Sequence, residues 1–438
     1  MEAMKREIVL KSFLENKERI DRYTEEGIEK YRKGDFTLKF KTGGKKKVKI
    51  THKKHTFLFG STAFMLDSFE KEGKEEEYKR LFSKIFNQAV VPLYWSDLEP
   101  EEGKPRFARD SVNIYRRPPV DTVLDFCKEY GLQPKGHCMV WHGFVPQWLA
   151  EKDEAGRKEA LERRFAEISS RYADKIPSFD IVNESAANYY RGEKVLFPDY
   201  DRYGMKLGAK YFPNNIKILN ETNGAIWTNY HLQGKYIPFN MQLRDFIREG
   251  IPFDEIGLQY HIFVPRAEIE EWKPGMSFLN AEVMLDVMEL FNSYGYPMHL
   301  SEITIPSYAG KLPENEEIQA YLTETLYKIW FATENMKSIV WWNLCDGYAA
   351  YAPLGSEEGE NQYAGGLCHF DMTPKPAYYA LDRLINKEWR TNIECECEGE
   401  LSFRGFYGEY EIEVLDGEKT ERYTVTLDEN GLCRTLAI

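Results

Sequence analysis

The chain of 438 residues carries 58 basic and 71 acidic side chains, which gives a net charge of −13 at neutral pH. Its 42% of apolar residues can fill a large core, which excludes global disorder, and its length suits a large domain with a small appendage. The acidic balance argues against a nucleic-acid partner, because phosphate binding needs clustered lysine and arginine. No apolar stretch is long enough to cross a membrane, so we expect no membrane partner.

The cysteines and the N-terminal sequence indicate in which cellular compartment the protein is expected. Seven cysteines are scattered through the chain, and Cys138, Cys345 and Cys368 lie in apolar runs, which is typical of buried thiols rather than a disulfide framework. No cysteine and histidine pairs occur at zinc spacing, so we expect no metal. The N-terminus lacks the apolar segment of a signal peptide. This predicts a cytoplasmic protein as the sequence is written, or a secreted one if a signal has been removed.

Residues 1–52 predict a helix followed by a β-hairpin. Apolar residues recur on one face from Lys5 to about Lys33, which is the period of an amphipathic helix. The segments Phe36–Lys41 and Lys47–His52 alternate in polarity around Gly43-Gly44, which favours two antiparallel strands joined by a turn. Neither segment carries residues that suggest chemistry.

Residues 53–388 alternate short apolar runs with helical patterns. Such alternation is typical of a parallel sheet, and eight runs favour closure into an α/β (β/α)8 TIM barrel. An open doubly wound sheet would normally carry a glycine-rich phosphate turn after its first strand, and Gly60-Ser61-Thr62-Ala63 is not one. The predicted strands are Phe57–Ala63, Ala89–Trp95, Gln133–Trp141, Ser178–Glu184, Ile216–Glu221, Glu255–His261, Pro297–Glu302 and Ser338–Leu344. The predicted helices include Lys74–Ile85, Val120–Tyr130, Ala155–Tyr172, Phe239–Arg248, Asn280–Tyr294 and Glu314–Thr333.

Residues 389–438 predict a small C-terminal β-module. Short alternating segments follow one another there, broken by Asp416-Gly417 and Asn430-Gly431. Five short strands bury too little surface for a stable core of their own. We therefore expect the N-terminal hairpin to pack with these strands in one composite accessory β-domain.

Three predicted barrel strands end in a glutamate: Glu184 after Asn183, Glu221 after Asn220 and Glu302 after Ser301. A carboxylate at the end of a buried strand is costly unless it is hydrogen-bonded, paired or working. In a TIM barrel the C-terminal strand ends surround the active site. A retaining glycosidase needs two such acids, one to protonate the leaving oxygen and one to attack the anomeric carbon. Our hypothesis is that Glu184 is the acid/base and Glu302 the nucleophile.

Further polar and aromatic residues gather at the same strand ends. Carboxylates that cap helices and histidines satisfied within a core would explain any one of them, but packing alone does not explain their density. These residues are Trp95, His137, Trp141, His142, Asn183, Asn220, Glu221, Gln259, His261, Trp342 and Asn343.

The order of several motifs resembles glycoside hydrolase family 10, the clan A family of β-1,4-xylanases. The match runs over roughly residues 55 to 410, and each motif is weak alone. Gly136–His142 and Pro146-Gln147-Trp148 resemble the third strand of the family, and Phe179–Glu184 resembles its acid/base strand. Ile256–His261 resembles the sixth strand, His299–Ile303 the nucleophile strand and Trp342–Asp346 the eighth strand.

The resemblance implies retaining hydrolysis of β-1,4-linked xylan or xylo-oligosaccharides, with a β-linked oligo- or polysaccharide as partner and no metal or organic cofactor. It implies Glu184 as acid/base, Glu302 as a nucleophile held by His261, and Asn183 as the residue that bonds the sugar 2-hydroxyl. The residues it implies around the cleaved sugar are Gln259, His137, Trp141 and Trp342.

The sequence departs from the family pattern at the positions that bind xylose in the two subsites on the non-reducing side of the cleaved bond. Val90–Tyr94 replaces a Glu-Asn-x-x-Lys group, Phe144 replaces a Gln, and Ala350 stands where a Trp is expected. Sugar hydroxyls buried there would lack partners, which weakens xylan binding. Stacking on aromatic residues, Tyr94 and Phe144 among them, could replace part of that grip. Two alternatives therefore stay open: a clan A β-glycosidase with a non-xylan substrate, and a non-catalytic carbohydrate-binding barrel.

Overall fold

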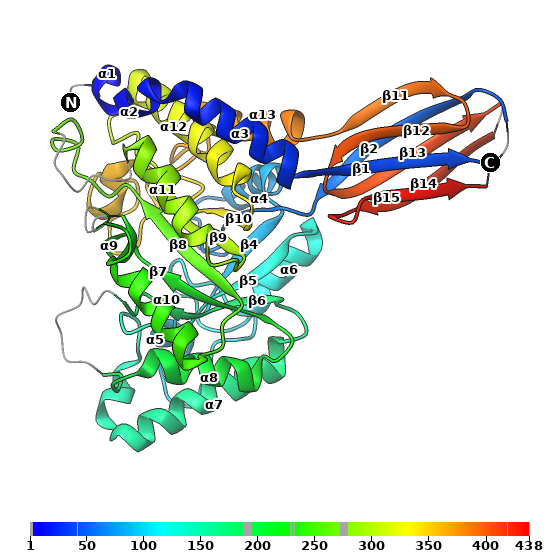
Figure 1. Ribbon diagram of the computed structural model, residues 1–438. Helices are drawn as coiled ribbons and strands as arrows, with labels where there is room; N and C mark the ends of the chain where they lie inside the picture. Colours follow the sequence, from blue (N-terminus) through cyan, green and yellow to red (C-terminus); the bar gives the residue numbers. More distant parts are fainter. Residues whose placement is uncertain are drawn as a thin grey trace.

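The computed structural model describes residues 3–41, 43–186, 195–227, 230, 233–271, 279–417 and 419–437. Within these residues, eight parallel strands close into the predicted barrel, with helices around it (Figure 1). The strands follow one another around the barrel in chain order, and the last pairs with the first. They are β3 (Leu58–Thr62), β4 (Gln88–Pro92), β5 (Gln133–Val140), β6 (Ser178–Asn183), β7 (Ile216–Glu221), β8 (Glu255–His261), β9 (Met298–Thr304) and β10 (Met336–Trp341).

The barrel strands are buried on both faces, because one face fills the barrel interior and the other meets the helices. Every residue of β4, β6 and β9 is buried. The larger surrounding helices are α4 (Lys74–Ile85), α6 (Val120–Tyr130), α7 (Glu154–Tyr172), α8 (Tyr200–Tyr211), α10 (Pro238–Glu249), α11 (Ala281–Asn292), α12 (Pro313–Ala332) and α13 (Pro376–Arg383), which a π-helical turn (Leu384–Glu388) extends. Short helices in the connecting loops are α5 (Trp95–Leu98), α9 (Asn223–Ile226), Gln147–Glu151 and Gly359–Tyr363.

Helix α8 is absent from the sequence-based prediction. It contains Gly204 and Gly208, and glycine lowers the helix propensity of a segment by about 1 kcal/mol per residue. Both glycines face the barrel: a Cβ at Gly204 would lie 3.2 Å from Val182, and one at Gly208 would lie 3.1 Å from Ile181. The glycines therefore let α8 approach β6 closely, and packing overrides the local propensity.

The predicted N-terminal helix forms in three pieces, α1 (Arg6–Val9), α2 (Lys11–Glu15) and α3 (Lys17–Tyr31). Figure 1 shows α3 running alongside α12 on the flank of the barrel, where Gly27 meets the backbone of Ala332 so closely that no Cβ would fit. The N-terminal segment is therefore packed on the barrel.

The two N-terminal strands form, but they do not pair with each other, so the predicted hairpin is wrong. Each strand instead finds partners in the C-terminal segment, and these long-range ladders outweigh the local turn signal of Gly43-Gly44. β1 (Lys33–Phe40) lies between β12 (Glu400–Phe406) and β15 (Leu432–Leu436), whereas β2 (Lys46–His55) lies between β11 (Asn392–Cys397) and β13 (Gly408–Asp416), which also pairs with β14 (Lys419–Leu427).

These two sheets form a small sandwich that projects from the barrel (Figure 1). Their apolar residues alternate along each strand, so that one face of each sheet is buried against the other. The shared core contains Phe36, Leu38, Phe40, Val48, Ile50, Tyr410, Ile412, Val414, Val425, Leu427 and Leu436. Both ends of the chain thus contribute to one core. That this sandwich forms a domain separate from the barrel of residues 53–388 remains a proposal.

The sandwich lies at the N-terminal ends of the barrel strands. A cavity of about 670 Å³ separates the two there. On the barrel side it is lined by the first residues of β3, β5, β7 and β8, and on the sandwich side by Phe406, Tyr407 and residues 428–430. Of the helices described, none has both the length and the apolar character needed to span a bilayer.

Candidate active site

A second cavity, of about 540 Å³, opens at the C-terminal ends of the barrel strands. The two predicted catalytic acids and the eight predicted sugar-contacting residues all line it: Tyr94, His137, Trp141, Phe144, Asn183, Glu184, Gln259, His261, Glu302 and Trp342. Ala350 and Tyr351 lie in the same wall. Sequence reasoning missed six further lining residues: Arg116, Arg117, Thr222, Asn223, Phe263 and Glu360. No motif signals them, because they lie in loops or follow the strand ends.

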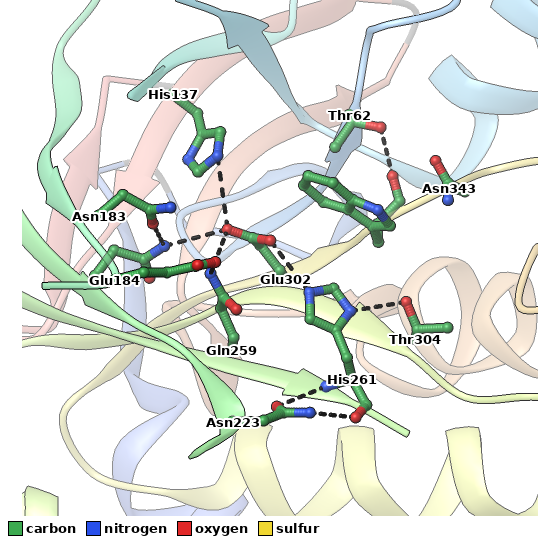
Figure 2. A network of polar contacts seen from close by, with 12 residues as sticks. Thr62, His137, Asn183, Glu184, Asn223, Gln259, His261, Glu302, Thr304 and Asn343 are labelled. Atoms are coloured by element: carbon green, nitrogen blue, oxygen red, sulfur yellow. Dashed lines mark hydrogen bonds and ion pairs between the residues drawn. The ribbon is translucent and has the colours of Figure 1, made fainter. Parts of the chain in front are cut away.

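Glu302 lies at the centre of a polar network (Figure 2). Its Oε2 is 3.1 Å from His261 Nε2, while its Oε1 accepts hydrogen bonds from Gln259 Nε2 at 3.0 Å and Asn220 Nδ2 at 3.2 Å. His137 Nε2 lies 3.7 Å from the same Oε1. Burial by itself raises the pKa of Glu302, but the charge of His137 and the hydrogen bond from His261 outweigh it and hold the pKa below its usual value. Glu302 is therefore kept ionised.

The Nδ1 atom of each of these two histidines, on the side of the ring away from Glu302, contacts a further side chain. Nδ1 of His261 lies 2.9 Å from Thr304 Oγ1, and its backbone N–H donates to Asn223 Oδ1 at 2.9 Å. Nδ1 of His137 lies 2.7 Å from Asp180 Oδ2, which also accepts from Lys135 Nζ at 2.7 Å. Burial by itself raises the pKa of Asp180, but the charge of Lys135 and the contact with His137 lower it more strongly. An ionised Asp180 thus aims His137 at the nucleophile candidate.

Glu184 follows directly after β6, in a left-handed backbone conformation with φ of 53°. Its N–H donates to the carbonyl of Asn220 at 2.9 Å, and its Oε1 accepts from Gln259 Nε2 at 2.8 Å. Burial, and after it the neighbouring charge of Glu302, raise the pKa of Glu184 to about 7. Near neutral pH one carboxyl group therefore holds a proton and the other does not, which is how proteins divide acid and base roles between two acids.

One donor fixes the spacing of the two acids. Gln259 Nε2 bonds Oε1 of Glu184 and Oε1 of Glu302 at the same time. These two oxygens therefore cannot be farther apart than the sum of 2.8 Å and 3.0 Å. That limit is below the separation of roughly 6.5–9.5 Å that an intervening water requires.

Asn183 presents an unused donor. The residue is 1% exposed, and its Oδ1 accepts from Asn220 Nδ2 at 2.7 Å, but its Nδ2 has no partner among the described residues. A buried amide N–H without a partner is costly unless a ligand supplies one. Because Asn183 lines the cavity beside Glu184, a hydroxyl group of a bound sugar is a suitable acceptor.

Glu221, which is fully buried, has a different role. Its Oε1 accepts the N–H of Ala186 at 2.6 Å and the hydroxyl of Ser185 at 3.2 Å. Burial raises its pKa to about 8. Glu221 thereby anchors the backbone that leaves Glu184, and it does not line the cavity.

One wall of the cavity is aromatic. Trp141 and Phe144 stack with their ring centroids 4.7 Å apart, and Tyr94 lies 4.7 Å from Phe144. Trp342 lies edge-on to His261, and Tyr351 stands at the rim with 86% of its surface exposed. The polar positions that the sequence lacks are thus filled by rings, whose flat faces suit stacking against sugars.

Five strand-end residues noted in the sequence lie outside the cavity wall: Trp95, His142, Asn220, Glu221 and Asn343. Trp95 is buried and donates from Nε1 to Glu99 Oε2 at 2.9 Å, and His142 Nδ1 lies 3.0 Å from the hydroxyl of Tyr200. Neither lines the cavity. Both therefore support the walls from outside.

The closed barrel and the paired glutamates at its C-terminal end define the class of TIM-barrel glycoside hydrolases. The particular family follows from comparison: the sequence model of "Glycosyl hydrolase family 10" matches residues 51–383. The chain belongs to glycosyl hydrolase family 10, which confirms the resemblance seen in its motifs.

Among known proteins, the chain is similar to plant and bacterial xylanases. Endo-1,4-beta-xylanase 2 of Arabidopsis thaliana is 24% identical over 389 residues, which are 85% of this chain and 31% of the relative. The chain thus spans about a third of that relative's length. Endo-1,4-beta-xylanase B of Thermotoga neapolitana is 22% identical over 72% of this chain and 84% of the relative.

Solved structures show the same fold. Xylanase 10B from Thermotoga petrophila RKU-1, in complex with xylobiose, has a TM-score of 0.58 and 20% identity over 76% of this chain and 95% of that chain. Native xylanase 10B from Thermotoga maritima has a TM-score of 0.59 and 20% identity, over 76% of this chain and 96% of that chain.

Proposed function

We propose that the protein is a retaining glycoside hydrolase that cleaves β-1,4-linked xylan or xylo-oligosaccharides by double displacement. The observation that carries the proposal is the pair Glu184 and Glu302, which share one Gln259 donor and whose pKa values are shifted in opposite directions. The family and the xylanases among its relatives support the substrate class.

The chemistry follows from the protonation states. Glu302, ionised, attacks the anomeric carbon, while Glu184 gives its proton to the departing glycosidic oxygen. A covalent glycosyl–enzyme bond then links the sugar to Glu302. Glu184, now a carboxylate, takes a proton from the water that breaks this bond. The spacing of the two acids supports this route, because it leaves no room for a water between Glu302 and the sugar.

The remaining cavity residues hold the sugar. The free Nδ2 of Asn183 donates to the 2-hydroxyl, and this contact strengthens as positive charge develops on the ring. Trp141, Trp342 and the rings of Tyr94 and Phe144 enclose the sugar on its apolar faces.

A second candidate function is cleavage of another β-glycoside. The aromatic wall favours it, because Tyr94 and Phe144 stand where polar contacts to xylose are expected. A non-catalytic binding role is less well supported, since binding alone does not require two carboxyl groups held in different protonation states.

The test is a product profile from xylan, xylo-oligosaccharides and aryl β-glycosides, with NMR detection of the first anomer released. We expect xylose-based products with the β configuration. Initial release of the α anomer would contradict retention, and turnover confined to a glucoside would favour the second candidate. If wild type and Glu302→Ala were equally inactive on every sugar yet bound one, the binding role would replace catalysis.

A further inference from the structure

Two adjacent arginines enter the cavity wall from the loop between α5 and α6. Arg116 and Arg117 both line the cavity and are 2% and 7% exposed. Arg116 has a left-handed backbone with φ of 60°. Of the ten described non-glycine residues in this conformation, three line the cavity: Arg116, Glu184 and Tyr351. The proposed catalytic mechanism uses neither arginine.

Arg117 keeps one nitrogen free on the aromatic side of the cavity. Its Nε donates to Asp97 Oδ2 at 2.7 Å and its Nη1 to the carbonyl of Arg116 at 2.9 Å, whereas Nη2 has no hydrogen-bond partner among the described residues. The guanidinium lies 4.2 Å from the centroid of the Tyr94 ring and 5.5 Å from that of Phe144. The rings fix the plane of the guanidinium group, so its free edge is preorganised.

Arg116 is a buried cation without a counterion in contact. Its Nη2 donates to Asn343 Oδ1 at 2.8 Å and its Nη1 to the carbonyl of Tyr348, and both of these acceptors are neutral. Its Nε has no hydrogen-bond partner among the described residues. Burial, and after it the charge of Arg117, lower the pKa of Arg116, whereas the charge of Glu360, which lines the same cavity, raises it. Burying an unpaired guanidinium is costly, so a ligand that brings a negative charge would relieve the cost.

Two side chains, Tyr94 and His137, lie between Arg117 and Glu302. The Tyr94 ring is 5.3 Å from the ring of His137, which faces Glu302, and Arg117 lies against the same Tyr94 ring. A group bound by Arg117 therefore belongs to the sugar next to the one that is cleaved.

We propose that this end of the cavity binds a carboxylate carried by the sugar chain, so that the preferred substrate is a uronic-acid-bearing β-glycan rather than a neutral one. Arg117 contacts the carboxylate through Nη2, and Arg116 adds its charge from behind. Guanidinium and carboxylate match in charge and shape. The inference rests on the proposed glycosidase function and specifies its substrate.

The experiment compares kcat/KM on acidic oligosaccharides and on their carboxyl-reduced, neutral twins of equal length. One series is xylo-oligosaccharides with a glucuronic acid side group, and the other carries a uronic acid unit in the main chain. We expect wild type to favour at least one acidic series by about 10- to 100-fold, because hydrogen bonds to charged groups have that strength. The preference should shrink as salt increases. The series that shows the preference identifies the source of the carboxylate.

Variants locate the contact. Arg117→Gln should lower the acidic-to-neutral ratio by about tenfold or more, with folding checked by circular dichroism. The matched control is Arg109→Gln, because Arg109 is exposed and pairs with Asp125 outside the cavity. The control should keep the wild-type ratio.

Three outcomes would overturn the proposal: equal kcat/KM on both twins in wild type, a preference that salt does not change, or an unaltered ratio in Arg117→Gln. The first two need no variant, so they decide the matter even if Arg117→Gln fails to fold. If the enzyme cleaves no glycan at all, the proposed function fails by itself. Calorimetric binding of the acidic and neutral twins to Glu302→Gln then tests the arginines separately.

Discussion

The two ends of the barrel each hold a half-buried glutamate whose pKa is raised to about 7, yet only one end has the arrangement of an active site. Glu184 lines the cavity at the C-terminal end, and Glu255 lines the larger cavity that faces the sandwich. Burial is the main cause of both shifts. The difference is the neighbour: beside Glu184 lies Glu302, whose pKa is lowered, whereas Lys135 and Lys337 lie near Glu255.

Neither the size of a cavity nor one shifted pKa is enough to identify an active site. A raised pKa states only that a carboxyl group is buried, and structural carboxyl groups share that property. Two carboxyl groups within reach of one amide, with pKa values pushed in opposite directions, define a proton donor and a nucleophile together.

The largest expected effect is a difference in kcat between two variants that carry the same substitution, glutamate to glutamine, at opposite ends of the barrel. Glu302→Gln should lower kcat by about 10⁴-fold or more, because it removes the attacking group. Glu255→Gln, the matched control, should leave kcat within about twofold. Both are measured with an aryl β-xyloside and with xylo-oligosaccharides. Comparable losses in the two variants would erase the distinction between the ends.

The pH dependence of kcat/KM should report the catalytic pair alone. Activity requires Glu184 protonated and Glu302 ionised, so it should fall about tenfold per pH unit above a pH near 7 and fall again in acid, below the usual pKa of a glutamate. His261→Ala removes a hydrogen bond to Glu302 and should move the acidic limb upward. A basic limb that moved in Glu255→Gln would show instead that the two ends are coupled.

A third test separates the sandwich from the chemistry. Ile412 is fully buried between the two sheets, so Ile412→Ala should destabilise the sandwich by about 2–5 kcal/mol. Limited proteolysis should then cut the C-terminal strands sooner, while kcat of the intact enzyme stays within about twofold. Loss of kcat in parallel with protease resistance would mean that the sandwich supports the site.

The smallest expected effect is on stability at the sandwich end. Folding raises the pKa of Glu255 from 4.5 to about 7, so the folded state keeps a proton that the unfolded state has released. The free energy of unfolding therefore falls as pH rises through this interval. Glu255→Gln cannot ionise and should be more stable than wild type by about 1–2 kcal/mol at pH 8, but equally stable at pH 4. Urea unfolding at the two pH values measures this difference.

The barrel could be predicted because its signals are local. Each strand is a short apolar run followed by a helical pattern, and strand-end residues converge in any closed parallel barrel, which brought Glu184, Gln259 and Glu302 together without knowledge of their contacts. Pairings between distant segments could not be predicted in this way. Gly43-Gly44 looks like a hairpin turn, but the partners of β1 and β2 lie at the other end of the chain.

The misses at the site have a similar cause. Arg116 and Arg117 lie in a loop with no periodicity, and only the folded chain shows that they line the cavity wall beside Tyr94. Helix α8 was missed because Gly204 and Gly208 serve close packing on β6, which the local sequence does not reveal.

The pairing of β1 with β12 and β15 has a consequence for biosynthesis. At about 5–20 residues per second, β1 leaves the ribosome roughly 20 s or more before its partners exist, and unpaired strands invite aggregation during such a wait. The neighbouring β2 carries Lys46, Lys47, Lys49, Lys53 and Lys54 among its ten residues. Lysines on an unpaired strand repel copies of the same strand. The lysines of β2 therefore oppose pairing between copies of this strand before its partners in the C-terminal segment are made.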